Sequence, residues 1–473
     1  MIFSSSIFLI YFLPIFLLVY NFVGNRFKNY VILGASIFFY SWGAPKFLFV
    51  ILGSTILDFF IVRRLYNSSN PLNRNLLLSL SIFINLGLLV YFKYANFFVE
   101  NLDVVLTSFG FSQIEWIKVV LPIGISFYTF QTLTYSIDVY RKVHVPLSKA
   151  SDYLLYIMSF PQMIAGPIVR FSSIADQITN RKDEIDDKLI GFYRFSIGLA
   201  KKVLIANVMA EQADLIFDSD LNNLTTANAW LGMIAYTFQI YFDFSGYSDM
   251  AIGLGRMMGF HFPENFNSPY VSKSISEFWR RWHITLGSFM RDYLYIPLGG
   301  SKVTSKYRLF FNLGIVFLLS GLWHGASWNF VIWGAYHGLF LIFDRLFLLS
   351  LLERIGKFTA TLLTFFIVMI GWIIFRIEDV EAIRMYLIKL LSFNSTFDFD
   401  TIPAFGAVLI LATVFSFLLS FKWGQKMENY LFQQVKYCLK DHLLLISISI
   451  VLFVLSVSSI TSSGFNPFIY FRF

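Results

Sequence analysis

Long apolar runs with few charges constrain this chain more than any other feature of its sequence. Of its 473 residues, 57% are hydrophobic and only 14% are charged, whereas a soluble domain carries about 25% charged residues. An apolar run of about 20 residues forms a helix long enough to cross a bilayer core of about 30 Å. The sequence therefore predicts an all-α polytopic membrane protein. We expect one membrane-embedded domain over residues 1–473, with about ten to twelve helical segments.

The distribution of charge agrees with this class and argues against others. The net charge of +8 comes from bases clustered in short loops, as the positive-inside rule requires of a multi-pass protein. We therefore expect a lipid bilayer as a partner and no nucleic acid. The single cysteine, Cys438, excludes an internal disulfide. No set of His, Cys and carboxylate residues has the spacing of metal ligands, so we expect no metal.

Two segments depart from the pattern of simple spanning helices. Residues 153–169 form an apolar run, but Pro161 and Pro167 would break a helix at mid-depth. Irregular backbone inside a membrane is tolerated only beside protein or a water-filled cavity, which predicts re-entrant structure around an internal cavity. Residues 272–295, with Phe278 and Trp282 at helical spacing, predict an amphipathic segment that lies along the cytoplasmic interface.

A polar turn over residues 321–329 lies between the apolar runs 310–319 and 330–347 and contains His324. Because both runs read as membrane helices, this turn should lie inside or near the bilayer. An ionisable side chain there costs roughly 2.5–3.5 kcal/mol on insertion scales and is a functional-site hypothesis by default. A neutral imidazole in an apolar shell can act as a general base toward a hydroxyl group. A purely structural role for this histidine stays open.

The segment 279–283 places Arg280 and Arg281 between two tryptophans and ends at His283. Arginines beside aromatic rings at a cytoplasmic surface can bind the phosphates of a nucleotide-like carrier, and they can equally be a positive-inside anchor. His283 is either a second polar group at the mouth of the same cavity or a cap at the interface.

Three further polar residues lie in apolar runs. Asp243 and Asp249 are six residues apart, and carboxylates in such a place need partners or a wet cavity. We predict structural ion pairs for both. His337 follows Trp333 by four residues on a helix, and we predict a satisfied core histidine there rather than a ligand.

The C-terminal tail, residues 461–473, leaves the last helix through Ser, Gly, Asn and Pro and ends in FIYFRF. A free terminus is normally polar, whereas these residues should become buried. One interpretation is an interfacial aromatic anchor. The other is a peptide that inserts into an external groove and presents the hydroxyl of Tyr470.

Several of these motifs together resemble the membrane-bound O-acyltransferase superfamily. The resemblance is to the bacterial branch that serves alginate and peptidoglycan O-acetylation and teichoic-acid D-alanylation, and it extends over nearly the whole chain. It rests on QIYFDFSGYSD (239–249), WRRWHITL (279–286), RDYLYIPLGG (291–300), GLWHGA (321–326) and the FIYFRF ending.

The resemblance implies roles for these residues. His324 takes the place of the family's catalytic histidine and His283 that of its second histidine. Tyr470 takes the place of an acyl relay outside the membrane. The fold that the resemblance implies is a ring of helices around a thinned centre with a central funnel or tunnel. It would bring a cytoplasmic donor and an external acceptor to one histidine. The side chains that we expect to bind substrate or donor are Trp279, Arg280, Arg281, Trp323 and Asn329.

The resemblance therefore predicts an O-acetyltransferase in the inner membrane of a bacterium. It would take an acetyl group from acetyl-CoA, or from a carrier-protein thioester, and hold no bound cofactor. A periplasmic or extracellular partner of the SGNH type would then transfer the acetyl group to a cell-surface polysaccharide such as peptidoglycan or alginate. The alternative from another class is a transporter or flippase of a cell-envelope precursor, which uses broken helices without covalent chemistry.

Overall fold

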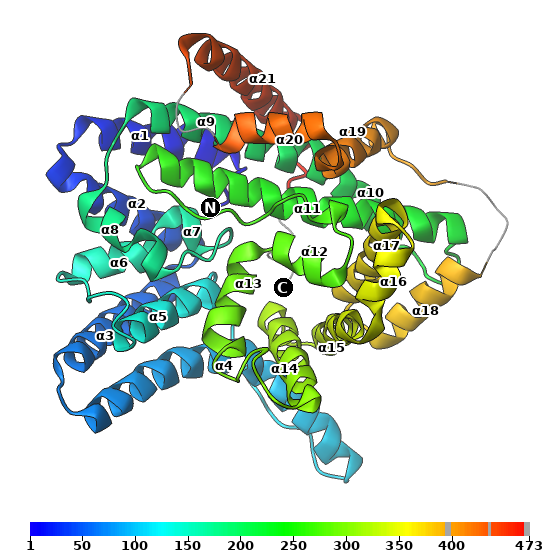
Figure 1. The fold of residues 1–473 in the computed structure, drawn as a ribbon, viewed down its shortest axis with the longest axis horizontal. Coiled ribbons are helices and arrows are strands. Elements are labelled where there is room, and N and C mark those ends of the chain that lie inside the picture. Colours follow the sequence, from blue (N-terminus) through cyan, green and yellow to red (C-terminus); the bar gives the residue numbers. More distant parts are fainter. Residues whose placement is uncertain (393–398, 434–436, 468–473) are drawn as a thin grey trace. The chain divides into compact units, whose positions relative to one another are not determined.

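The structure is a computed structural model, and it describes residues 1–392, 399–433 and 437–467 (Figure 1). Helices make up the ordered elements of this part of the chain, and it contains no strand. The prediction of an all-α protein is confirmed.

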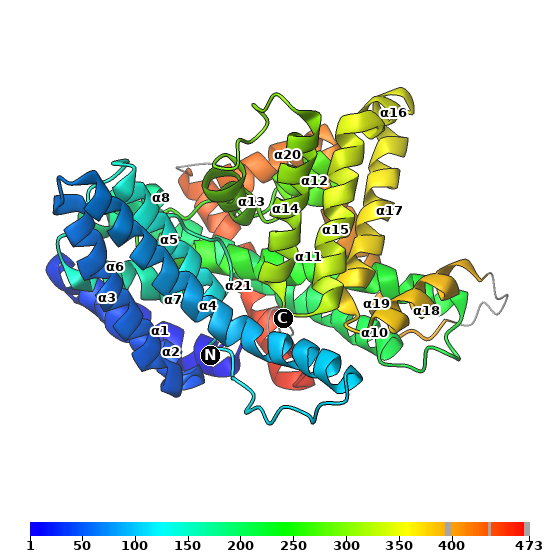
Figure 2. The ribbon, with the colours of Figure 1, turned by 90° about the horizontal axis from the view of Figure 1, so that it is seen from below.

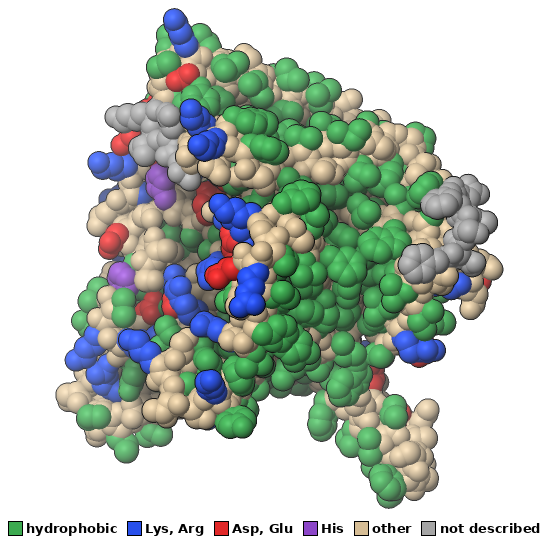
Figure 3. Space-filling model, turned by 45° about the vertical axis from the view of Figure 1, so that its right-hand side comes forward, with side chains coloured by type: hydrophobic (Ala, Val, Ile, Leu, Met, Phe, Trp, Pro, Cys, Tyr) green, Lys and Arg blue, Asp and Glu red, His purple; other side chains and the backbone are tan. Residues whose placement is uncertain are grey.

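Five helical stretches of the described residues are long and apolar enough to cross a membrane. They are Pro45–Asn67, Pro71–Ser108, Trp328–Arg354, Lys357–Arg376 and Leu439–Ser463. A further pair, Phe405–Ser420 and Lys422–Phe432, is bent by 95°. Figure 3 shows hydrophobic side chains over broad parts of the face that it draws, and Phe83 on one of these helices is 75% exposed. Exposed apolar surface of this extent suits lipid, and the prediction of a multi-pass membrane protein is confirmed.

The chain divides into two compact units. Unit 1 comprises Met1–Glu184 and Met258–Pro263, and unit 2 comprises Ile185–Met257 and Glu264–Phe473. The single domain over residues 1–473 and the central funnel or tunnel stay predictions.

Unit 1 contains the helices α1 to α8. Their bounds are α1 Leu13–Phe22, α2 Lys28–Gly43, α3 Leu48–Asn67, α4 Pro71–Ser108, α5 Ile125–Tyr140, α6 Ala150–Met158, α7 Phe160–Met163 and α8 Phe171–Asn180. The predicted break in residues 153–169 is confirmed, because α6 ends before Ser159 and no helix covers residues 164–170. Nine residues of α6 rise only about 14 Å, too short to cross a bilayer core.

A buried carboxylate joins four helices of unit 1. Asp58 on α3 is 1% exposed, and four polar side chains lie within hydrogen-bond distance of its two oxygens. Tyr153 on α6 donates at 2.7 Å, and the other three are Ser81 and Asn85 on α4 and Ser136 on α5. A carboxylate that accepts this many hydrogen bonds is a satisfied structural centre.

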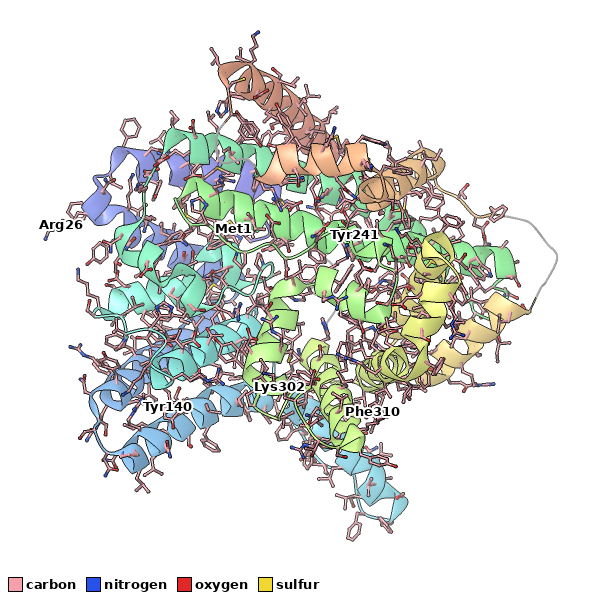
Figure 4. All side chains as sticks on the ribbon, in the orientation of Figure 1. Met1, Arg26, Tyr140, Tyr241, Lys302 and Phe310 are labelled. Atoms are coloured by element: carbon pink, nitrogen blue, oxygen red, sulfur yellow. The ribbon has the colours of Figure 1, made fainter. Side chains whose placement is uncertain are left out.

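Unit 2 contains the helices α9 to α21. Their bounds are α9 Ile185–Ala200, α10 Asn207–Phe217, α11 Thr226–Met257, α12 Ile275–Arg281, α13 Ile284–Met290, α14 Lys306–His324, α15 Trp328–Phe343, α16 Leu349–Arg354, α17 Lys357–Arg376, α18 Val380–Leu391, α19 Phe405–Phe417, α20 Lys422–Glu428 and α21 Leu439–Ser463. A π-helix, Lys201–Ala206, joins α9 to α10. Helix α11 is buried over most of its length and lies along α9, and Tyr241 marks it in Figure 4. Figure 2 shows α14, α15 and α17 side by side.

The two carboxylates of α11 form ion pairs, as predicted. Asp243 lies 2.8 Å from the ammonium of Lys202. Asp249 lies 2.6 Å from both Arg194 and Lys201. Each pair joins α11 to α9 or to the π-helix that follows it.

The predicted amphipathic segment over residues 272–295 is helical but not continuous. The segment forms two short helices, α12 and α13, with Trp282 and His283 between them. The helix is interrupted because backbone groups on both sides of the break bond to residues 265–267 and not within one helix. Asn267 N–H donates to Arg281 C=O, and Ile284 N–H donates to Asn265 C=O, both at 2.9 Å. The apolar face of the segment also packs inward, since Phe278 is 1% exposed.

Candidate functional site

His324 is the last residue of α14, and the turn 325–327 carries the chain into α15. The predicted hinge between two apolar helices is therefore confirmed. The helices approach each other closely at this end, because a Cβ atom on Gly321 would lie 2.2 Å from the carbonyl oxygen of Phe330. A larger side chain at position 321 would push α15 away, and small residues allow such crossings between membrane helices.

Aromatic rings surround the half-buried imidazole of His324. Its ring centroid lies 4.9 Å from that of Trp323, 5.1 Å from that of Trp333 and 5.2 Å from that of Phe375. These rings come from the end of α14, from α15 and from the end of α17. The imidazole thus has apolar walls on several sides, an environment that disfavours extra charge unless a reacting partner supplies the counter-charge.

His283 occupies the break between α12 and α13. Its φ of 46° is left-handed, a conformation that histidine adopts more readily than most residues. The side chain is 1% exposed, and its Nδ1 lies 3.0 Å from Oδ1 of Asn265. That oxygen also accepts from the hydroxyl of Thr285 at 2.8 Å, which identifies it as the acceptor end of the amide.

The proton of His283 is therefore assigned to Nδ1, and Nε2 carries a lone pair. Nε2 is buried and has no hydrogen-bond partner within the described ranges. Burial lowers the pKa of His283 to about 3. At neutral pH this residue is a hydrogen-bond acceptor with unused capacity rather than a cation.

One tryptophan contacts both histidines. The ring of Trp323 lies 4.9 Å from that of His324 and 6.0 Å from that of His283, between centroids. Phe244 on α11 covers the second imidazole at 4.8 Å. The structure thus brings together the two histidines that the sequence singled out, although 41 positions separate them in the chain.

His337 on α15 belongs to the same aromatic cluster, a position that sequence reasoning missed. Its ring lies 4.9 Å from that of Trp279 and 5.0 Å from that of Trp333. It is fully buried, and neither ring nitrogen has a hydrogen-bond partner in the part of the chain that the structure describes. The prediction of a satisfied core histidine is right about the core and wrong about satisfaction, because α17 faces it with Gly371, which offers no polar side chain.

The arginines of the segment 279–283 differ in their surroundings. Arg281 forms an ion pair with Glu277 at 2.9 Å and donates to the carbonyl of Asn267 at 3.1 Å. Arg280 is exposed. Trp279 packs its ring against Trp333 at 5.4 Å, so the segment has an aromatic side inside the unit and a basic side outside it. The binding of phosphates by either arginine stays a prediction.

Asn329 and Tyr470 complete the predicted residues. Asn329 is fully buried, and its amide nitrogen donates to the carbonyls of Ile374 and Phe375 at 3.3 and 3.2 Å. Its side chain therefore holds the end of α17 beside the turn, and contact with a donor stays a prediction. Tyr470 lies outside the described residues.

Comparison with known proteins identifies a family and several relatives. The sequence model of the membrane-bound O-acyltransferase family matches residues 141–377. The probable alginate O-acetylase AlgI of Pseudomonas aeruginosa is 46% identical over 390 residues, which is 82% of this chain and 74% of that protein. The peptidoglycan O-acetyltransferase of Helicobacter pylori is 35% identical over 430 residues, 83% and 80% of the two chains. The teichoic acid D-alanyltransferase of Bacillus subtilis is 32% identical over 231 residues, 46% and 58% of the two.

Proposed function

This chain belongs to the membrane-bound O-acyltransferase family, and we propose that within it the protein is an O-acetyltransferase of the bacterial inner membrane. It would move an acetyl group from a cytoplasmic thioester, acetyl-CoA, across the membrane for the O-acetylation of an extracytoplasmic polysaccharide. The observation that carries this proposal is the pair of imidazoles, His283 and His324, that both lie against the ring of Trp323.

The choice of an acetyl group rests on the extent of the similarity. The alginate and peptidoglycan relatives named for O-acetylation match 82% and 83% of this chain. The D-alanyltransferase matches 46% of it. The first two relatives also act on polysaccharides by their names, so the proposed acceptor is a polysaccharide of the cell surface.

The proposed chemistry uses His324 as the base. Its imidazole takes the phenolic proton of Tyr470 while the phenol oxygen attacks the carbonyl carbon of the thioester. The tetrahedral intermediate then breaks its C–S bond, and the departing sulfur takes the proton back from the imidazolium. A free thiol leaves, the acetyl group remains as a tyrosine ester, and His324 is neutral again.

His283 supports this reaction without taking the proton. Burial lowers its pKa to about 3, so it is a weak base, but the lone pair on Nε2 can accept a hydrogen bond and orient a hydroxyl group. Trp279, Arg280 and Arg281 are proposed to bind the donor, the exposed guanidinium of Arg280 by contacting phosphate.

The second half of the reaction needs an external partner. An SGNH-type transferase would attack the acetyl-tyrosine ester with its serine hydroxyl, which regenerates the Tyr470 phenol and carries the acetyl group to the polysaccharide. Membership of an acyltransferase family disfavours the alternative of a transporter or flippase, because such a protein forms no ester.

The test uses purified protein in liposomes supplied with isotopically labelled acetyl-CoA. Mass spectrometry of the C-terminal peptide should detect an acetyl adduct on Tyr470. The adduct should be lost in His324→Ala and in Tyr470→Phe, and it should persist in His261→Ala, which removes an exposed histidine. An unchanged adduct in a folded His324→Ala protein would refute the catalytic assignment. If an acetylated carrier protein labels Tyr470 and acetyl-CoA does not, the donor is the carrier-protein thioester and not acetyl-CoA.

A further inference from the structure

A buried ion pair in unit 2 contacts the C-terminal tail. Lys202 lies in the π-helix after α9 and Asp243 lies on α11, and the two side chains are 2.8 Å apart. Each side chain is only 2% exposed. A buried charge pair of this kind stabilises a fold no better than apolar residues of similar size would, so its polar groups need another explanation.

The ammonium of Lys202 forms an ion pair with Asp243 and donates two hydrogen bonds. One goes to Oδ1 of Asn207 at 2.8 Å and the other to the backbone carbonyl of Pro467. The amide nitrogen of Asn207 in turn lies 3.3 Å from the carbonyl of Phe465 and 3.3 Å from Oδ1 of Asn466. Lys202 and Asn207 thus use their remaining hydrogen-bonding capacity on residues 465–467.

The path of the chain agrees with a docked tail. Helix α21 packs along α9 and the π-helix that follows it, and Figure 1 shows α21 next to α9. It ends at Ser463, and Gly464 turns the backbone with a φ of 62°, a conformation that glycine adopts without strain. The turn brings the next three residues to the ion pair instead of leaving them in solvent.

We propose that Lys202, Asn207 and Asp243 form a binding site for the backbone of the C-terminal tail and hold the acyl-accepting end of the chain at the histidine cluster. The proposal deepens the function given above and rests on it. Asp243 is followed on α11 by Phe244, whose ring covers His283 at 4.8 Å. Three extended residues span about 11 Å at most, so a tail bound at Pro467 would keep an acyl-accepting residue three positions later within that reach of the anchor.

The anchor can be measured without any activity assay. In a background with the single Cys438 replaced by Ser, Pro467→Cys introduces a thiol beside the ion pair and keeps the backbone carbonyl. A bulky water-soluble maleimide should label it slowly in the otherwise unchanged protein. Asn207→Leu deletes the contacts to Phe465 and Asn466 together with the oxygen that accepts from Lys202, and it keeps both charges of the ion pair. Labelling should therefore be about tenfold faster or more.

A neighbouring lysine supplies the matched control. Lys202→Met should also release the tail. If this variant fails to fold because Asp243 is left as an unpaired buried charge, the double variant Lys202→Met with Asp243→Leu removes both charges and replaces it in the test. Lys201→Met changes the same charge one residue earlier, but Lys201 pairs with Asp249, which keeps Arg194 as a partner. Labelling in this control should stay slow.

The outcomes separate the anchor from the proposed function. Faster labelling in Asn207→Leu, with unchanged labelling in Lys201→Met, supports the anchor even if no acetyl-tyrosine ever forms. Unchanged labelling in every folded Lys202 and Asn207 variant overturns the anchor, and acetylation that depends on His324 would then stand alone. Where both hold, release of the tail should lower the acetyl adduct on Tyr470 by a similar factor.

Discussion

In unit 1 the carboxylate of Asp58 has four hydrogen-bonding neighbours, whereas in unit 2 the imidazoles of His283 and His337 have ring nitrogens without a partner among the described residues. All three side chains are almost fully buried. Their surroundings differ in kind: hydroxyl and amide groups face the carboxylate, and aromatic rings face the imidazoles.

This difference separates a structural centre from a reactive one. A buried polar group whose hydrogen bonds are complete adds to the fold and has nothing left to offer a ligand. A buried imidazole with an unused lone pair costs stability, and it persists where a reacting group completes it. We therefore expect substitutions in the first region to act on unfolding and those in the second to act on acyl transfer.

The largest effect should come from Asp58→Ala. It leaves the hydroxyl of Tyr153 buried without its carboxylate acceptor, and an unsatisfied buried group costs about 1–3 kcal/mol. It also removes a packed side chain and the carboxylate that Ser81, Asn85 and Ser136 contact. The free energy of unfolding should fall by about 3 kcal/mol or more, seen as a lower midpoint of thermal unfolding in detergent. Acyl transfer per folded molecule should be unchanged. A loss of acyl transfer in a protein of unchanged stability would mean that Asp58 takes part in the reaction. The distinction between a structural centre in unit 1 and a reactive one in unit 2 would then be wrong.

The next effect concerns His283→Asn, which keeps a residue that tolerates left-handed backbone. Transfer to Tyr470 should fall by about 10²-fold, because a positioned hydrogen bond in the transition state is lost. The midpoint of unfolding should hardly move. His144→Asn, a change of the same type outside the cluster, should leave both measurements as they were. Normal transfer in folded His283→Asn protein would make this imidazole a structural residue.

Local features of the sequence predicted part of this contrast. The helix–turn–helix around His324 follows from a polar turn between two apolar runs, and the break near Pro161 follows from proline itself. Asp58 also lies inside an apolar run, where a carboxylate needs partners, but no prediction was made for it. Its partners could not be named, because they lie 23 to 95 residues away and meet it only through the packing of four helices.

The histidine cluster shows where local reasoning ends. The apolar spacing over residues 272–295 fits one helix, and the break at His283 arises from backbone contacts with Asn265 and Asn267. Whether His337 finds a hydrogen-bond partner depends on which residue of α17 faces it, and Gly371 does so. Neither the break at His283 nor the surroundings of His337 is marked in the sequence by a periodicity or a motif, so only the structure reveals them.

A smaller effect is expected in the pH dependence of stability. His283 has a folded pKa of about 3 and an unfolded pKa of about 6.5, so the unfolded state binds the extra proton first as the pH falls. Its contribution is complete above about pH 6.5 and is lost between there and about pH 3. From pH 7.5 to 5.5 the loss amounts to about 1.4 kcal/mol, and His283→Asn should lose that much less stability over the interval. Identical pH profiles for the two proteins would mean that the pKa of His283 is the same in the folded and unfolded states.

The smallest change in stability should come from His337→Leu, and its size tests the contrast most directly. Leucine has a similar volume and removes two buried nitrogens that have no partner among the described residues, which favours the variant, while the ring contacts with Trp279 and Trp333 are lost. Each term is about 1 kcal/mol, so the free energy of unfolding should stay within about 1 kcal/mol of its original value. A loss of more than about 2 kcal/mol would show that a bound water or another group already satisfies the imidazole. His337 would then belong with Asp58 among the structural centres.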